Sequence, residues 1–207
     1  MKIPYRFKVI FLSFLAVFIC YIDRVNISVA IIPMQDQFGW SEIQKGFILS
    51  SFYIGYMITM IVGGYIADKY GGKKVLGYCL IIWSIFTIIT PFFAYLGLWW
   101  LLFIRVLMGL GEGITFPSWH AIYARWIPFK ERTRAVAFTN SGIAAGTMFG
   151  YGMAAIIISN YSWEWVFYLF GMLGFFWFIF WNKNVTSFPE NNKYIPAEEL
   201  DLILKEA

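Results

Sequence analysis

The sequence predicts an all-α membrane protein whose chain crosses the bilayer six times. Of its 207 residues, 60% are hydrophobic and only 14% are charged, whereas an average soluble domain carries roughly 25% charged residues. The apolar residues form six blocks, each of about 20 residues, which is the length that a helix needs to cross a hydrocarbon layer of about 30 Å. No soluble core requires so much apolar surface.

The first three blocks cover residues 9–32, 46–67 and 75–93. The first block follows Lys2, Arg6 and Lys8, as a signal peptide would, but no small-residue cleavage site follows it, so it is interpreted as a membrane span. We expect this span to end at Pro33, before a polar loop. A basic turn separates the second block from the third.

The last three blocks cover residues 99–125, 135–158 and 165–181. The fifth block carries glycines that are typical of close helix packing, namely Gly142, Gly146, Gly150 and Gly152. After the sixth block the chain becomes polar, and residues 197–207 have the apolar spacing of a short helix with acidic residues at its start. We therefore expect a six-helix membrane domain over residues 1–185 and a linker with a short helix over residues 186–207.

The basic residues predict the orientation of the spans. Lys and Arg fall at the N-terminus, in the turns after the second and fourth blocks, and in the tail, while the opposite side receives only Lys45. The positive-inside rule places the richer side in the cytoplasm. The sequence thus predicts an integral, multi-pass membrane protein with both termini cytoplasmic, in the cell (inner) membrane if the source is bacterial.

Several function classes are disfavoured. The net charge of +4 is spread over short loops between spans, which indicates topology and not binding to nucleic acid. No Ser/His/Asp set, metal-spaced His or Cys cluster, or phosphate-cradling loop occurs, and the sequence has a single histidine. We expect no enzyme, no cofactor and no metal site. The two cysteines, Cys20 and Cys79, fall inside apolar blocks and do not indicate a redox compartment.

Ionisable residues inside the spans mark the candidate site. Arg105, Glu112 and His120 interrupt the fourth block, and Asp23 and Arg24 interrupt the first at a similar depth. A charge at the centre of a bilayer helix costs about 2.5 to 3.5 kcal/mol on insertion scales, so such residues usually face a bundle interior or a watery path. On one helix, Arg105 and Glu112 would lie within about 20° of one face and about 10 Å apart. The alternative is a purely structural ion-pair network.

The turn after the second block carries a recognisable motif. Residues 64–74 read Gly, three residues, Asp, a basic residue, any residue, Gly, any residue and two basic residues. This pattern resembles the signature of the major facilitator superfamily. We expect Gly64 and Gly71 to permit a tight cytoplasmic turn. Asp68, Lys69 and Lys73 would then form breakable contacts with neighbouring helix ends, as a cytoplasmic gate does.

Other residues narrow the resemblance to the anion:cation symporter family, which includes bacterial sugar-acid symporters, sialin and vesicular glutamate transporters. The matching residues are Tyr21 to Asn26, Arg105, the Gly109 to Gly113 run with Glu112, Phe116, Pro117, His120, Trp126, Pro128, Glu131 and Arg132. The family has twelve helices, and this chain resembles its N-terminal half, built from two inverted repeats of three helices. The resemblance implies transport of an organic, carboxylate-type anion, coupled to protons or sodium, and a missing C-terminal half.

The resemblance also implies roles for single residues. Arg24 matches the arginine that contacts the negative group of the substrate. Asp23 matches the acid beside it in bacterial sugar-acid symporters, Glu112 matches an acid tied to proton coupling, and Arg105 matches the partner of Glu112 on the same helix. As buried carboxylates, both Asp23 and Glu112 are expected to carry protons. Two further residues, Tyr21 and Tyr56, are expected to hydrogen-bond a hydroxylated substrate, and His120 is a candidate relay.

Two departures leave the substrate open. Leu49 stands where vesicular glutamate transporters have histidine, and Ile143 stands where bacterial sugar-acid symporters have glutamine. The alternative from another class is a membrane module of the same fold, such as a receptor, that transports nothing. Six helices would line only one side of a path, so a fragment, a truncated gene and a functional half all remain open.

Overall fold

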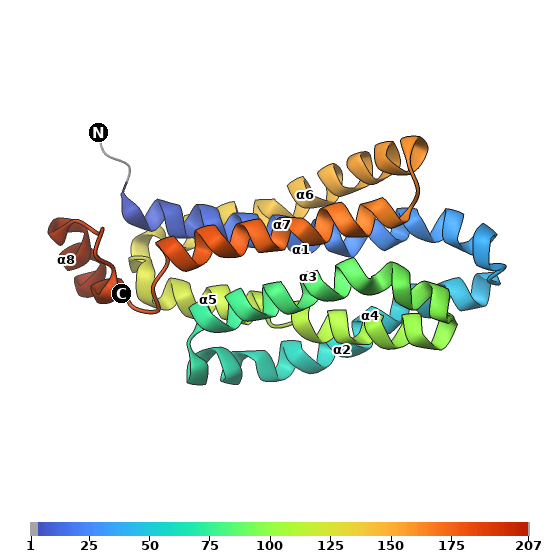
Figure 1. Cartoon of the computed structure of the whole chain (residues 1–207). Coiled ribbons are helices and arrows are strands. Elements are labelled where there is room, and N and C mark those ends of the chain that lie inside the picture. Colours follow the sequence, from blue (N-terminus) through green and yellow to red (C-terminus); the bar gives the residue numbers. More distant parts are fainter. Residues whose placement is uncertain (1–3, 207) are drawn as a thin grey trace.

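The computed structural model describes residues 4–206, and every regular element in that range is helical. The long helices run side by side along one direction (Figure 1). Six segments are long and apolar enough to cross a membrane, and the fourth of these consists of two helices. The elements are α1 (Tyr5–Phe38), α2 (Glu42–Tyr70), α3 (Gly72–Leu96), α4 (Leu98–Glu112), α5 (Thr115–Trp126), α6 (Phe129–Asn160), α7 (Glu164–Asn184), the 3₁₀ turn η1 (Pro189–Asn191) and α8 (Ala197–Glu206).

The first helix is longer than expected, because it continues through Pro33. The expectation that it would end there is wrong. Membrane helices tolerate proline where neighbouring groups satisfy the freed backbone positions. The helix ends instead at Gly39, whose φ of 66° lies in the left-handed region that favours glycine. The next helix begins at once, with a capping box between Ser41 and Gln44.

The packing pairs have the symmetry of an inverted repeat. Helix α1 packs along α6, and α4 packs along α2 in the same way. An operation that exchanges α1 with α4 and α5, α2 with α6, and α3 with α7 converts one pair into the other, and it leaves the observed α3–α7 pair unchanged. The predicted pair of three-helix repeats accounts for this arrangement.

Glycines allow the repeated pairs to approach closely. A Cβ atom at Gly55 would collide with the backbone of Val106 on α4, and one at Gly109 would collide with the backbone of Phe52 on α2. In the other pair, Gly142 and Gly146 lie against the α1 backbone in the same manner, so the predicted glycine stripe is confirmed there. Nothing lies within 4 Å of a Cβ at Gly152, which therefore is not part of the interface.

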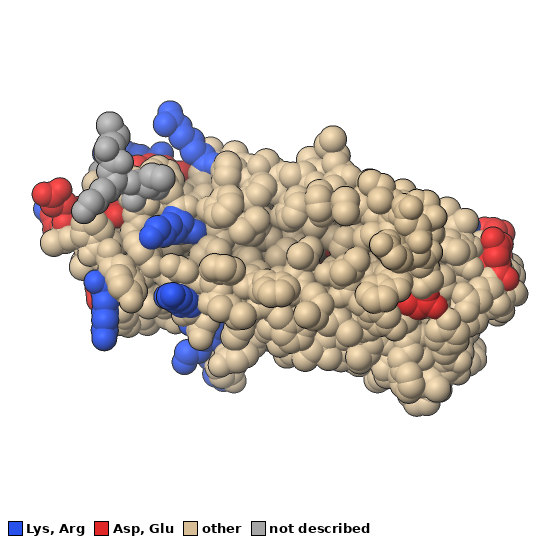
Figure 2. Space-filling view, turned by 45° about the horizontal axis from the view of Figure 1, so that its top comes forward, with Lys and Arg blue, Asp and Glu red and all other residues tan. Residues whose placement is uncertain are grey.

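Charged side chains are sorted along the bundle axis. On the face drawn in Figure 2, the Lys and Arg side chains gather at the end that carries α8, and the long middle is free of them. Figure 1 shows the start of α1 and the turn between α2 and α3 at this same end. We call it the basic end.

Helix α8 is tied to the basic end by one carboxylate. Glu199 accepts hydrogen bonds from the backbone N–H groups of Tyr5 and Arg6, at 2.7 and 2.9 Å, and from the Arg6 guanidinium at 3.2 Å. The same guanidinium bonds Glu131 of α6 at 2.7 and 3.0 Å. Glu199 thus caps the otherwise unpaired first turn of α1, and Arg6 joins three helices.

Candidate functional site

Asp23 and Arg24 are adjacent in α1 but occupy different surroundings. The Arg24 side chain is 13% exposed and reaches toward α2 and α4. Asp23 is completely buried, and its polar neighbours are Trp83 and Thr87 of α3. Neighbouring residues point about 100° apart around a helix. Arg24 therefore points toward α2 and α4, whereas Asp23 points into the interior beside α3.

Arg24 forms an ion pair with Glu112 across the α1–α4 interface. Its Nη2 and Nε atoms donate to the same carboxylate oxygen, Oε2, at 3.2 and 3.4 Å. The thiol of Cys20, one turn earlier on α1, donates to this oxygen at 3.3 Å. The other oxygen, Oε1, has no hydrogen-bond partner among residues 4–206. The carboxylate therefore keeps one acceptor position free while its partner oxygen holds three donors.

Three aromatic rings surround the Arg24 guanidinium. Its central carbon lies 4.6 Å from the ring centroids of both Tyr21 and Tyr56, and 5.2 Å from that of Phe52. An arginine stacked on ring faces is held in one plane without losing its hydrogen-bond donors. The structure thus places both predicted tyrosines at the predicted arginine.

Arg105 is not the ion-pair partner of Glu112. Although 2% exposed, it has no carboxylate within 4 Å in the described part of the chain. Its guanidinium packs on the ring of Phe52 at 5.1 Å, and Nη1 lies 4.0 Å from the sulfur of Met108. The partnership of Arg105 with Glu112 that the resemblance implies is thus not a direct ion pair here, because Arg24 of α1 occupies the carboxylate.

Asp23 shares the electrostatic environment of this group without a direct bond. Neither of its carboxylate oxygens has a hydrogen-bond partner within the described range. The charges that act on it are those of Glu112 and Arg105. The guanidinium groups of Arg24 and Arg105 both lie near the ring of Phe52, at 5.2 and 5.1 Å.

The fourth span bends just after the acid. Helix α4 ends at Glu112, and α5 begins at Thr115 after an irregular step at Gly113 and Ile114. A Cβ at Gly113 would collide with Tyr56, so α2 approaches the chain closely at this step. His120 lies beyond it on α5, where it is exposed and stacks on Trp119 at 3.7 Å. The structure does not bring His120 together with Glu112.

The turn between α2 and α3 forms at the second glycine of the signature. Gly71 has a φ of 86°, as a tight turn requires, whereas Gly64 lies inside α2 with open space around it and takes no part in the turn. Lys73 donates to Asn182 of α7 at 2.6 Å. Lys69 lies over the rings of Tyr65 and Tyr70, and Asp68 is exposed. One cross-helix contact of the predicted kind is therefore present, through Lys73.

Sequence reasoning missed two members of the site. Phe52 is one of 22 phenylalanines, and nothing in its spacing distinguishes it. Cys20 lies four residues before Arg24, a separation that puts both side chains on one helix face. Helical periodicity could therefore have indicated that Cys20 belongs to the site.

Comparisons with known proteins identify the family of the chain. The family model of the Major Facilitator Superfamily matches residues 13–203. A probable anion transporter of rice chloroplasts, from Oryza sativa subsp. japonica, is 46% identical over 98% of this chain. A chloroplast ascorbate transporter of Arabidopsis thaliana is 42% identical over 98% of the chain, and human sialin is 35% identical over 96%. The chain spans 38%, 38% and 46% of these three relatives.

Solved structures share the same fold. The proton:xylose symporter XylE aligns with a TM-score of 0.81 at 19% identity, over 98% of this chain and 49% of that one. A bacterial homolog of the lysosomal transporter Spinster aligns with a TM-score of 0.78 at 23% identity, over 91% of this chain and 45% of that one. The all-α fold and its likeness to half of a transporter of this superfamily are thereby confirmed.

Proposed function

The chain belongs to the Major Facilitator Superfamily, and on that premise we propose that it is the N-terminal half of a secondary transporter for an organic, carboxylate-type anion, coupled to protons. The relatives are transporters and not enzymes, and several are anion transporters by name. A second half of six helices would complete the path. That proposal is supported by relatives of more than twice this length and by solved structures of about twice this length.

The observation that carries the proposal is the Arg24–Glu112 pair inside its aromatic surround. A guanidinium offers paired N–H donors that match a carboxylate, and stacking on Tyr21 and Tyr56 orients them. In this structure those donors are turned to Glu112. An anion that is to bind Arg24 must therefore compete with the protein's own carboxylate.

The protonation state of Glu112 determines whether Arg24 pairs with Glu112 or with the substrate. Protonation of Glu112 removes the negative charge that holds Arg24, because the attraction depends on the product of the two charges. The arginine is then free to pair with the carboxylate of the substrate, and the Tyr21 and Tyr56 hydroxyls lie within the same surround for its hydroxyl groups. Asp23 would take up a second proton, which removes an unpaired buried charge. Neutral acids then permit the half to rock against its partner half.

The charge pattern supports one membrane orientation. We propose that the basic end faces the cytoplasm or the equivalent compartment, with the signature turn, both termini and the linker over residues 186–207 on that side. The membrane is the cell membrane if the source is bacterial. Chloroplast relatives point to an organelle membrane if it is a plant.

A binding screen tests the substrate class. Purified protein is titrated with sugar acids, sialic acid, dicarboxylates and phosphate at several pH values, with and without sodium. We expect a carboxylate to bind more tightly as the pH falls, independently of sodium. Binding of phosphate alone would refute the carboxylate class, and a requirement for sodium would refute proton coupling. Binding without transport in the complete protein would favour the receptor-like alternative.

A further inference from the structure

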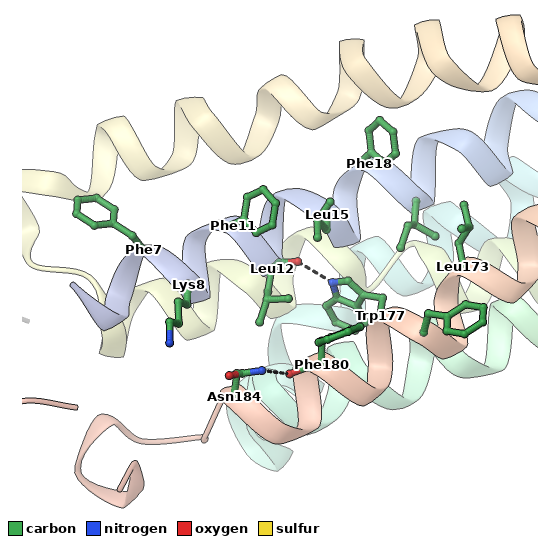
Figure 3. Close-up of a pocket in the computed structure, with 12 residues that line it drawn as sticks. Phe7, Lys8, Phe11, Leu12, Leu15, Phe18, Leu173, Trp177, Phe180 and Asn184 are labelled. Carbon is green, nitrogen blue, oxygen red and sulfur yellow. Dashed lines mark hydrogen bonds between the residues drawn. The ribbon is translucent and has the colours of Figure 1, made fainter. Parts of the chain in front are cut away.

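A large apolar groove runs along the outside of the bundle between α1 and α7 (Figure 3). Its volume is about 780 Å³, within the range of about 300 to 1,000 Å³ that is typical of ligand sites. Phenylalanine is the commonest residue of its lining, with Phe7, Phe11 and Phe18 of α1 and Phe176 and Phe180 of α7. We call it the α1–α7 groove.

The groove faces away from the candidate site. Arg24 marks the face of α1 that is turned to α2 and α4, and at 100° per residue the groove residues of α1 lie about 100° to 180° around the helix from it. Helices α1 and α7 are both long and apolar enough to cross a membrane, and their groove lies on the outside of the bundle. The body of any occupant must therefore be apolar.

The length of the groove matches one leaflet of a bilayer. Its lining on α1 extends from Phe7 to Ile19, which is about 18 Å at 1.5 Å per residue. Half of a hydrocarbon core of about 30 Å is about 15 Å. The groove therefore begins at the basic end and stops near the middle of the membrane, as one acyl chain does.

A cation stands at the outer end of the groove. Lys8 is exposed, lines the groove beside Asn184, and lies over the ring of Tyr5 at 4.8 Å. It has no carboxylate within 4 Å in the described residues. A lysine at this depth reaches the level of lipid head groups. Basic pockets between spans on the cytoplasmic side suit anionic head groups.

The floor of the groove is fixed by a bond between its two walls. The indole N–H of Trp177 donates to the backbone carbonyl of Leu12 at 2.8 Å, which ties α7 to α1 under the aromatic rims (Figure 3). A second, smaller groove of about 400 Å³ lies on the α6 side of Phe7 and Phe11, with the exposed cation Arg134 among its lining residues. A lipid with two chains thus finds apolar recesses on both sides of one ridge.

From this geometry we propose that the α1–α7 groove binds an acyl chain of an anionic phospholipid, whose phosphate pairs with Lys8. The chain is held by van der Waals packing in the groove, since the surrounding lipid tails are as apolar as its lining. The Lys8 pair selects the anionic head group over a zwitterionic one. The site is separate from anion transport and places a structural lipid against the helix that carries Arg24.

Native mass spectrometry of the purified protein with added lipid tests the proposal. The probes are phosphatidylglycerol and phosphatidylcholine with identical oleoyl chains, and glycerol phosphate as the head group alone. We expect phosphatidylglycerol to bind more tightly than phosphatidylcholine. Lys8→Gln should weaken phosphatidylglycerol by about five-fold and leave phosphatidylcholine unchanged. Lys74→Gln, an exposed lysine at the same end but on α3, is the matched control and should have no effect.

A second variant tests the apolar part of the site. Leu15→Trp fills the groove and should weaken both lipids, while glycerol phosphate should not displace the bound phosphatidylglycerol. Equal binding of the two lipids, an equal loss in Lys8→Gln and Lys74→Gln, or unchanged binding in Leu15→Trp would overturn the proposal. Closure of the groove by a second copy of the chain, detected as a lipid-free dimer, would also overturn the proposal.

Discussion

Arg24 of α1 donates two hydrogen bonds to a single oxygen of Glu112 on α4, and the second oxygen of that carboxylate stays unpartnered in the described chain. Arg24 therefore holds one oxygen of the carboxylate and leaves the other oxygen open. A structural ion pair that only joins two helices gains most when both oxygens are bonded. The open oxygen is the position at which a proton can be added without first breaking the pair.

Replacement of Arg24 by lysine should weaken anion binding by at least about ten-fold, although the charge is kept. Lysine lacks the planar fork and does not stack on Tyr21 and Tyr56 as a guanidinium does. Isothermal titration with the best ligand of the binding screen measures the loss. Arg125→Lys, at the basic end of α5, is the control, and an affinity in Arg24→Lys equal to wild type would remove Arg24 from the binding site.

Replacement of Glu112 by glutamine should preserve exchange of the anion across the membrane but abolish its accumulation in a pH gradient. Glutamine keeps the shape of the side chain but carries neither a charge nor a transferable proton, so the complete transporter should still exchange labelled anion. It should no longer concentrate that anion in vesicles with an imposed pH gradient. Accumulation at the wild-type level would show that Glu112 does not carry the coupled proton.

Replacement of Gly109 by alanine should destabilise the bundle by about 1 to 3 kcal/mol, as overpacking does. The added methyl group would meet the Phe52 carbonyl on α2, and backbone cannot move aside as a side chain can. Gly152→Ala is the matched control, since open space surrounds it. Thermal unfolding in detergent reports the difference, and equal midpoints for the two variants would contradict the close α2–α4 approach.

Replacement of Glu199 by alanine should release α8 from the basic end and lower stability by about 1 to 2 kcal/mol, the range for loss of a helix cap. Three hydrogen bonds to Tyr5 and Arg6 disappear in this variant. Glu198 is the neighbouring exposed acid, so Glu198→Ala should behave as wild type. Limited proteolysis between α7 and α8 distinguishes them: faster cleavage is expected only for Glu199→Ala.

Much of the fold could be predicted from the sequence, because apolar blocks and basic turns are direct consequences of the bilayer. The six spans lie at the positions predicted from hydropathy. The boundaries were less accessible: Pro33 did not end α1, and the step at Gly113 inside the fourth span left no mark in the apolar pattern. Both depend on how neighbouring helices satisfy or crowd the backbone, which a single helix does not reveal.

The residues of the site were easier to predict from the sequence than the ion pair that they form. Buried charges are rare in spans, so Asp23, Arg24, Arg105 and Glu112 stand out in any reading of the chain. Periodicity put Arg105 and Glu112 on one face of one helix, but the ion-pair partner of Glu112 is Arg24 of α1. The ring of Phe52, which both arginines contact, belongs to a residue type too common in this chain to be singled out.

The central claim is that a proton on Glu112 and an anion on Arg24 favour each other's binding. Anion affinity measured across pH in wild type and in Glu112→Gln tests it most directly. We predict that wild-type affinity rises as pH falls, because a neutral Glu112 releases Arg24, and that the variant binds with high affinity at every pH. A variant whose affinity follows pH as the wild type does would contradict the claim.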